Sequence, residues 1–235
     1  MSGLAVRVLD QIRGDIISGH LRSGSHLKID YLAARYRASH MPIREALRHL
    51  EGEGLIVKRP NRGARVRAVN ADLVNTIFEV RMSIESMLAR HAATRATAHD
   101  IIRLEAIQAE IERHTAASNA ESLLLANRRF HKVVEEIADL PEAAELANRQ
   151  CELLDSLWRV YGLDMARMAG VNSDHRYIIQ ALRERNPEAA AIIVTAHVIK
   201  GRMDLIRCMS KAPARGSIVS AIETTIAHRD RCSGS

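Results

Sequence analysis

Three histidines and one asparagine in the second half of the chain have the side chains and the spacing that a metal site needs. Asn127 and His131 are four residues apart in a segment of helical periodicity, so both side chains lie on one helix face. His175 precedes Pro187 by 12 residues, and His197 follows it by 10. Three imidazoles with one oxygen ligand suit Zn²⁺, Ni²⁺, Mn²⁺ or Fe²⁺. Open coordination positions on such a metal could take the carboxylate of a small molecule.

Helix geometry predicts that the two later histidines meet. Residues 185–187 read Arg-Asn-Pro, which predicts a turn followed by a helix that begins with proline, and hence an antiparallel helical hairpin. At a rise of about 1.5 Å per residue, both histidines lie about 15–18 Å from that turn and therefore at nearly the same level. A single histidine on a helix more often has a structural role. Joined by the Asn127 and His131 pair from a third helix, the two facing imidazoles could form a metal site, whose predicted ligands are Asn127, His131, His175 and His197.

The elements that would position these ligands are helices packed on helices. Apolar residues make up 47% of the chain and aromatic residues only 3%, a balance that disfavours a sandwich or a barrel. Apolar residues recur at helical spacing over 73–93, 101–114 and 122–138. Pro141 is expected to start a long helix that continues to about Tyr161. A further helix should begin at Ser173 or Asp174, after an uneven stretch.

The first part of the chain predicts a different and smaller unit. Helical spacing over residues 5–18 is followed by Gly19, and a short helix is expected around residues 32–36. A second helix follows after a tight turn, with Ser39 as its N-cap and Pro42 in its first turn. Two strands, 55–59 and 64–68, closed by Asn-Arg-Gly at 61–63, complete a winged helix-turn-helix.

Charge is concentrated on this first unit. Residues 1–67 contain 13 lysines and arginines against 6 acidic residues, whereas the remaining chain contains 21 against 22. The excess behind the net charge of +6 therefore lies on the predicted winged helix. A basic surface of this kind neutralises phosphates and releases counterions, which predicts a nucleic-acid partner.

The same residues resemble a known family. The runs 19–27, 32–33, 39–55 and 62–66 are similar to the amino-terminal domain of GntR-family bacterial transcription regulators. We expect base contacts from the start of the second helix and from the wing, and phosphate contacts around them. The expected base-contacting residues are His40, Met41, Arg44, Arg62 and Gly63, and the expected phosphate-contacting residues are Arg35, Ser39 and Arg48.

Individual side chains suggest how the winged helix would recognise DNA bases. Arg44 can make a bidentate contact to a guanine edge, and Gly63 allows the wing backbone to approach the minor groove while Arg62 supplies charge. The family usually has Arg or Lys where this chain has His40, and some members have Arg where it has Asp30. The base preference therefore stays open. Since Asp30 would repel a phosphate, we expect it to face away from the DNA.

The helical part resembles the effector domain of the FadR-type, or FCD, branch of that family, on the strength of Glu79-Val80-Arg81-Met82-Ser83-Ile84-Glu85. Arg81 could hold a carboxylate ligand in a central cavity, and the alternative of equal weight is an ion pair with a neighbouring Glu. The Asx-to-His spacing is similar to the metal-binding FCD pattern. Asn127 stands where that pattern most often has Asp, and a neutral amide binds a cation more weakly.

Three parts are expected in the chain. Residues 1–69 form the DNA-binding domain, with the helix-turn-helix at about 29–52 and the wing at 55–68. Residues 70–210 form an all-α antiparallel bundle for effector binding and dimerisation, and 211–235 form a tail of unknown order. No apolar run approaches the ~20 residues that span a bilayer, and no signal-peptide core is seen, so a soluble cytoplasmic protein without a membrane partner is expected. Cys151, Cys208 and Cys232 lack CxxC spacing and are expected to be reduced thiols.

These observations predict a transcription regulator, most often a repressor in this family, rather than an enzyme. A homodimer would bind a palindromic operator on double-stranded DNA, and a small carboxylate-bearing metabolite would control that binding. One alternative is a metal-dependent hydrolase using His131, His175 and His197, whose turnover of esters, amides or lactones would follow metal content. The other is an architectural DNA-binding protein whose thermal stability no metabolite changes.

Overall fold

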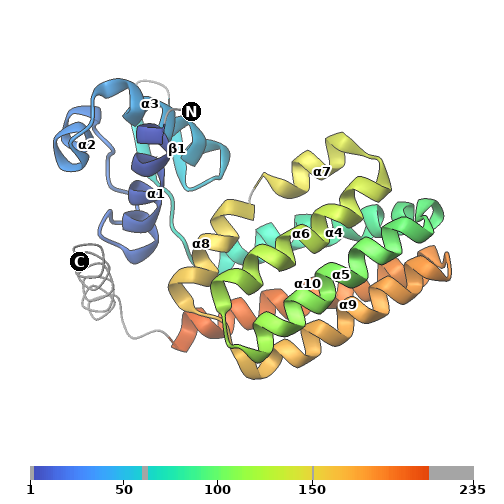
Figure 1. The fold of residues 1–235 in the computed structure, drawn as a ribbon. Helices are drawn as coiled ribbons and strands as arrows, with labels where there is room; N and C mark the ends of the chain where they lie inside the picture. The colour runs from blue at the N-terminus through green and yellow to red at the C-terminus, as the bar shows by residue number, and fades with distance from the viewer. Residues whose placement is uncertain (1–2, 60–62, 150, 212–235) are drawn as a thin grey trace. The chain divides into compact units, whose positions relative to one another are not determined.

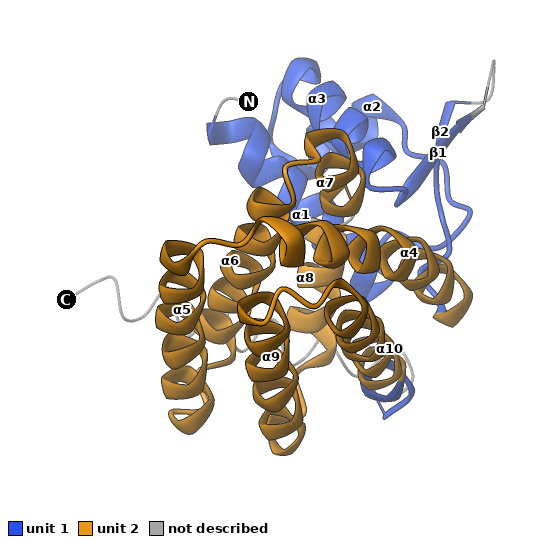
Figure 2. Ribbon diagram, turned by 90° about the vertical axis from the view of Figure 1, so that its right-hand side faces the viewer, with its two compact units in different colours: residues 1–70, 207–235 blue, residues 71–206 orange. Residues whose placement is uncertain are grey.

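The computed structural model describes residues 3–59, 63–149 and 151–211, which are mostly helical with one two-stranded sheet (Figure 1). Figure 2 shows the two compact units into which the chain divides. The first unit holds the residues up to Asn70 together with the end of the last helix from Arg207, and the second spans Ala71–Ile206. The mainly α fold with a small hairpin agrees with the sequence prediction. Arg62, Cys232 and the predicted tail after Lys211 lie outside the described residues.

The first unit is built on the packing of its first and third helices. Its helices are α1 (Gly3–Ser18), α2 (Ile29–Tyr36) and α3 (His40–Gly52). The apolar stripe of α1, which includes Val8 and Ile12, is buried, and so is the stripe of α3 at Ile43, Leu47 and Leu50. Burial of these branched side chains stabilises the unit by about 1.5–3 kcal/mol for each. The predicted extent of α1 and its end before a glycine are confirmed.

A three-residue turn joins α2 to α3. Arg37 adopts a left-handed conformation with φ of 49°, which ends α2 and reverses the chain direction. Ser39 occupies the N-cap position of α3 in an extended conformation, as predicted, but its hydroxyl makes no capping hydrogen bond. Pro42 lies in the first turn of α3, where its missing N–H interrupts no helical hydrogen bond. The predicted helix-turn-helix is therefore present.

The wing follows α3 directly. Strands β1 (Ile56–Arg59) and β2 (Gly63–Val66) pair antiparallel, with Ile56 opposite Val66 and Arg59 opposite Gly63. His26 adds an isolated bridge to Arg65 in the second strand. Both strands are shorter than predicted, and β2 ends at Val66 rather than at residue 68.

The second unit is a bundle of helices around α6. Its elements are α4 (Ala71–Arg95), α5 (Ala98–Ala116), α6 (Ala120–Ala138), α7 (Pro141–Asn148), α8 (Cys151–Tyr161), the 3-10 turn η1 (Met165–Arg167), α9 (Met168–Arg183) and α10 (Pro187–Lys211). α6 packs against both α4 and α5, and α5 also packs against α9 (Figure 1). Phe130 in the middle of α6 is fully buried and marks the centre of this core.

Capping residues fix where several of these helices begin. Thr97 and Asp100 form a capping box at the start of α5, each side chain accepting a hydrogen bond from the other residue's backbone N–H. Asn119 accepts from the backbone N–H of Ser122 at the start of α6. Asn186 accepts from the backbone N–H of Ala189, so α10, which begins at Pro187 as predicted, is also capped at its start.

Two sequence predictions about this unit are wrong. The long helix expected from Pro141 to about Tyr161 is divided into α7 and α8. At the end of α7, the side chain of Asn148 donates to the carbonyl of Ala144 and to Glu135, a local bonding pattern that competes with helix continuation. In addition, α9 begins at Met168 rather than at residue 173 or 174, because the preceding turn η1 leads directly into it.

Two further observations concern the helices. In the described part of the chain, none is both long and apolar enough to cross a membrane. Cys151 lies at the start of α8 and Cys208 lies in α10, and no disulfide joins these two described cysteines.

A buried ion pair joins α1 to the end of α3, and its loss should destabilise the first unit. Arg13 donates to both carboxylate oxygens of Glu53, at 2.9 and 2.6 Å, and both side chains are about 6% exposed. We expect Glu53→Ala to cost up to about 3–5 kcal/mol, because it removes the buried carboxylate and leaves the guanidinium with the carboxylate of Asp10, which is exposed. Hydrogen–deuterium exchange should show faster exchange in the peptides of α1 and α3.

The matched control is Glu51→Ala, which removes a carboxylate from the exposed ion pair with Lys58 in the same unit. Its expected cost is below about 1 kcal/mol. Equal protection of α1 and α3 in both variants would show that the buried pair does not hold the unit together.

Candidate functional site

One face of α3 has the exposed side chains expected of a reading helix, that is, the helix that enters a DNA groove and contacts the bases. Met41, Arg44 and Arg48 are three and four residues apart, so they lie on one face, and all three are exposed. The opposite face contains the buried residues Ile43 and Leu47. Met41 is 64% exposed, so its apolar side chain is available for contact with a base or its methyl group.

An acidic side chain lies beside the start of this helix. Asp30, in the first turn of α2, lies 3.1 Å from His40 at the first turn of α3, as measured between Oδ1 and Nε2. Both side chains are exposed. The prediction that Asp30 faces away from the DNA concerns a bound duplex and stays a prediction.

Arg35, expected to contact phosphate, has a partner within its own unit. Its Nε and Nη2 donate to Oδ2 of Asp15 in α1 at 3.0 and 2.7 Å, and the hydroxyl of Tyr36 donates to the same oxygen. The hydrogen bond to Asp15 raises the pKa of Arg35 above its usual value. The guanidinium remains exposed, so it is positioned by α1 while its outer edge stays accessible.

The wing tip places one of its two predicted DNA contacts within the described residues. Gly63 begins β2 with φ of 67° and is exposed. Among the described residues, a side chain here would meet His26 alone, at ordinary contact distance, so the positive φ rather than crowding favours glycine. The backbone at Gly63 is consequently open to a close approach.

The three predicted histidine ligands come together in the second unit. His131 is on α6, His175 on α9 and His197 on α10, and one ring nitrogen from each lies within 4.8 Å of the others. The ring centroids of His175 and His197 are 4.9 Å apart, and those of His131 and His197 are 5.1 Å apart. The hairpin geometry predicted from residue spacing is therefore observed. Such a convergence of imidazole nitrogens has the size of a metal site.

Burial keeps the imidazoles of His131 and His175 neutral, which is the form that binds metal. His175 is fully buried and stacks on the ring of Phe130 at 4.2 Å. Burial, reinforced by His197, lowers the pKa of His131 to about 3 and lowers the pKa of His175 well below its usual value. Within the described residues, Nε2 of His175 has no hydrogen-bond partner although it is buried. A lone pair that faces the other two rings and lacks a partner fits a divalent cation.

Carboxylates lie on the outer side of the other two rings. Nδ1 of His131 is 4.0 Å from Oε2 of Glu85, and Nδ1 of His197 is 3.5 Å from Oδ2 of Asp174. Burial alone would raise the pKa of each carboxyl, but Arg81 outweighs it at Glu85, and His197 with Lys200 outweighs it at Asp174. Both groups are therefore ionised, and among the described residues Oε2 of Glu85 and Oδ2 of Asp174 form no hydrogen bond.

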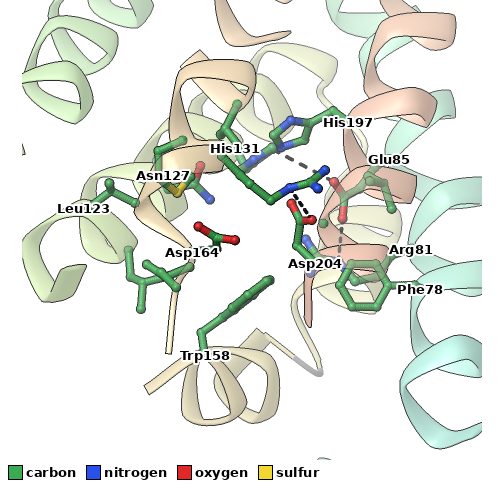
Figure 3. Close-up of a pocket in the computed structure, with 17 residues that line it drawn as sticks. Phe78, Arg81, Glu85, Leu123, Asn127, His131, Trp158, Asp164, His197 and Asp204 are labelled. Carbon is green, nitrogen blue, oxygen red and sulfur yellow. Dashed lines mark hydrogen bonds and ion pairs between the residues drawn. The ribbon is translucent and has the colours of Figure 1, made fainter. Parts of the chain in front are cut away.

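A cavity of about 110 Å³ opens beside the cluster (Figure 3). Figure 3 shows His131 and His197 at one end of it and Trp158 at the other. The predicted ligand Asn127 also lines this cavity, one helical turn before His131 on α6. Its apolar walls are formed by Phe78, Leu123, Leu124, Trp158, Leu163, Met168, Val171 and Val198. An apolar pocket with a few convergent polar groups is typical of a small-molecule site.

Two ion pairs set the charge of the cavity wall. Arg81, the predicted effector-binding residue, lines the cavity and donates from Nε to Oε1 of Glu85 at 2.6 Å. This contact is the ion pair with a neighbouring Glu that was the alternative prediction for Arg81. Its guanidinium also lies over the ring of Phe78, 5.6 Å from the centroid. Farther along, Nε of Arg167 lies 2.6 Å from Oδ1 of Asp204. The cavity thus offers two guanidiniums, each with a carboxylate beside it.

Sequence reasoning missed the groups that surround the histidines. It identified no carboxylate beside them, whereas Glu85 and Asp174 contact their outer nitrogens. It also missed Arg167 and Asp204 at the cavity. Glu85 was visible as the i+4 partner of Arg81, and Asp174 as the neighbour of His175, but neither spacing by itself indicates a role.

Comparison with known proteins gives two family matches. Residues 4–66 match the model of bacterial regulatory proteins of the gntR family, and residues 76–200 match the model of the FCD domain. Together these matches cover both compact units.

Individual relatives agree with these matches. The chain is 30% identical over 209 residues to a probable D-xylose utilization operon transcriptional repressor of Paenarthrobacter nicotinovorans, covering 83% of this chain and 85% of the relative. It is 27% identical over 184 residues to the Nta operon transcriptional regulator of Aminobacter aminovorans, covering 78% and 86%. The solved structure of E. coli McbR/YncC is similar in fold, with a TM-score of 0.64 and 19% identity over 88% of this chain and 99% of that one. The chain belongs to the GntR family of bacterial regulatory proteins, in its FadR-type subgroup with an FCD domain.

Proposed function

We propose that this GntR-family regulator represses transcription by binding a palindromic operator, and that a small organic acid held beside a metal ion controls this binding. The observation that carries the DNA-binding part is the exposed face of α3, where Met41, Arg44 and Arg48 align beside the wing. Relatives named as operon repressors support the direction of regulation. A regulator of bacterial operons acts in the cytoplasm, which is the location we propose.

The two arginines of that face should have separable effects on DNA binding. Arg44, near the start of α3, is proposed to contact a base, and Arg48, one turn later, a phosphate. We expect Arg44→Ala to cost about 1–3 kcal/mol on the operator and to reduce discrimination against random DNA. Arg48→Ala should weaken binding to both and reduce the salt slope by about 1. Fluorescence anisotropy on the upstream region of the protein's own gene, across a salt series, measures both.

Arg113→Ala is the matched control, because it removes an exposed arginine from α5 of the helical unit. It should leave affinity and salt slope unchanged. The DNA-binding proposal fails if the unaltered protein does not distinguish its own upstream region from random DNA at moderate salt.

The operator-binding species is proposed to be a homodimer formed through the helical unit. Val80 and Met87 are seven residues apart on one face of α4, and both are exposed. Apolar side chains aligned in this way favour burial against a second copy. Sedimentation equilibrium should therefore give twice the 26.1 kDa mass of the chain, and Val80→Glu should shift the mass toward that of one chain. A single-chain mass at micromolar concentration would contradict the dimer.

The effector site is proposed to combine metal and cavity. His131, His175 and His197 would hold Zn²⁺, Ni²⁺, Mn²⁺ or Fe²⁺, and Asn127 would add a neutral oxygen ligand from the cavity wall. The bound metal would supply a Lewis-acidic position for the carboxylate of an organic acid. Arg81 lies at the same cavity and would face that acid with the edge of its guanidinium not used by Glu85.

One helix offers a route from this site to the DNA-binding unit. α4 begins at Ala71, five residues after β2 ends at Val66. Its residues Phe78, Arg81 and Glu85 line the cavity. A ligand that binds better when α4 is held in one arrangement would shift the population of DNA-competent states, provided that its affinity differs between those states.

We infer that this site binds its ligand without turnover. The two carboxylates that contact the imidazoles, Glu85 and Asp174, are ion-paired with Arg81 and Lys200. Neither is therefore available as a general base with a raised pKa. The family relationship to transcription regulators supports the same conclusion.

A thermal-shift screen of organic acids, with and without Zn²⁺, tests the effector site. A ligand that binds only the folded state must raise the unfolding temperature. We expect Zn²⁺ alone to stabilise the protein and an acid to stabilise it further only when Zn²⁺ is present. His197→Ala should abolish both shifts, whereas His99→Ala, which removes an exposed histidine from α5, should keep them.

Unchanged metal content and unchanged shifts in the His131→Ala, His175→Ala and His197→Ala variants would overturn the metal site. Shifts by acids that are equally large without metal would overturn the metal-assisted part and leave the cavity as the binding site.

A further inference from the structure

A chain of hydrogen bonds runs from the surface of the helical unit to His175. Nε of Arg176 donates to Oε1 of Glu112 at 2.8 Å, and Nε2 of Gln108 donates to the same oxygen at 2.8 Å. Oε1 of Gln108 is 2.8 Å from Nδ1 of His175. Gln108 and Glu112 are on α5, whereas the histidine and Arg176 are adjacent on α9.

Donor and acceptor types fix the direction of every bond in this chain. A carboxylate only accepts, so Glu112 requires the NH₂ group of Gln108 to point toward it. The same NH₂ group is 3.4 Å from Oδ1 of Asn172, a second acceptor. The carboxamide oxygen of Gln108 must then face His175, and it can only accept. Nδ1 of His175 therefore carries the proton.

Asn172 is itself oriented in the same way. The hydroxyl of Thr115 donates to the carbonyl of Ile111 at 2.9 Å, so its oxygen is left to accept from Nδ2 of Asn172 at 3.4 Å. This arrangement turns Oδ1 of Asn172 toward Gln108. Two independent acceptors, Glu112 and Asn172, thus oppose a flip of the Gln108 amide.

A neutral imidazole that is protonated on Nδ1 has its lone pair on Nε2. In His175 that nitrogen is buried, and no described residue forms a hydrogen bond with it. Gln108 is only 4% exposed, so water does not replace its contact with the ring. The chain of bonds therefore selects the one tautomer of His175 that can coordinate a metal through Nε2.

We propose that Gln108 and Glu112 are positioning residues of the metal site, which set the tautomer of His175 from a surface ion pair on Arg176. This inference rests on the proposed metal site and adds to it the residues that prepare one ligand before the metal arrives. The outer end of the chain is accessible, because the side chain of Arg176 is 67% exposed and lines an open groove between α5 and α9.

The decisive experiment exchanges the amide of Gln108 and the carboxylate of Glu112, which together set the direction of the hydrogen bonds. Gln108→Leu removes the acceptor and should weaken Zn²⁺ binding by about 10- to 100-fold. The double variant Gln108→Glu with Glu112→Gln reverses the positions of amide and carboxylate but again places an acceptor beside His175. It should recover most of the affinity that Gln108→Leu loses, with the amide of Asn172 turned so that its NH₂ group faces the new carboxylate. Zn²⁺ affinity is measured by competition with a chromophoric chelator on the full chain.

A second measurement follows the tautomer without metal. Nitrogen-15 NMR of histidine-labelled protein should show His175 protonated on Nδ1 in the unaltered protein and in the double variant, and a mixture of tautomers in Gln108→Leu. Glu105→Ala is the control, because Glu105 pairs with Arg183 in the same groove and does not contact Gln108 by any of the bonds above. It should leave affinity and tautomer unchanged.

The outcomes separate this inference from the metal site itself. Equal Zn²⁺ affinity and an unchanged tautomer in Gln108→Leu, with binding lost in His175→Ala, would overturn the positioning role and keep the metal site. Failure of the unaltered protein to bind Zn²⁺ would overturn both.

Discussion

The helical unit depends on one constraint, which is that the buried imidazole of His175 must stay neutral beside two other imidazoles. A neutral ring has one protonated nitrogen and one lone pair, so burial obliges it to find an acceptor on one side. Gln108 is that acceptor for Nδ1 of His175. The lone pair is then on the buried Nε2, with which no described residue forms a hydrogen bond. Since one ring nitrogen from each of the three histidines lies within 4.8 Å of the others, the proposed metal site follows from how the hydrogen bond of one ring is satisfied in the core.

The winged unit has the opposite arrangement, since the side chains proposed to contact DNA are held outside its core. α3 buries Ile43 and Leu47 against α1 and thereby turns Arg44 and Arg48 outward. The buried bonds between Arg13 and Glu53 hold the end of the same helix. A reading helix must be rigid in the protein and exposed to solvent, and this division of faces meets both needs.

What the sequence predicted well depended on local periodicity and constant helix rise. The 12- and 10-residue spacings around Pro187 placed His175 and His197 side by side because every residue of a helix advances by the same distance. The reading face of α3 followed from the positions of Ile43 and Leu47 in the same way. Gln108 was missed because its contact with His175 joins residues 67 positions apart, and no spacing rule connects them.

Other failures have local physical causes. The division between α7 and α8 was missed because Asn148 is a tolerable helix residue, and only its bonds to Ala144 and Glu135 show that it competes with the backbone. The contact between Asp30 and His40 was not predicted, because it joins the first turns of two different helices and no spacing rule connects them.

Charge balance explains why metal and effector would depend on each other at the proposed site. Three neutral imidazoles and the amide of Asn127 leave the two positive charges of the ion uncompensated among its direct ligands. The nearest carboxylates are already shared, Glu85 with Arg81 and Asp174 with Lys200. An organic acid that adds its carboxylate to the metal supplies the missing negative charge. The coupling free energy between two binding sites is reciprocal. Bound metal and bound acid should therefore each raise the affinity of the protein for the other by the same factor.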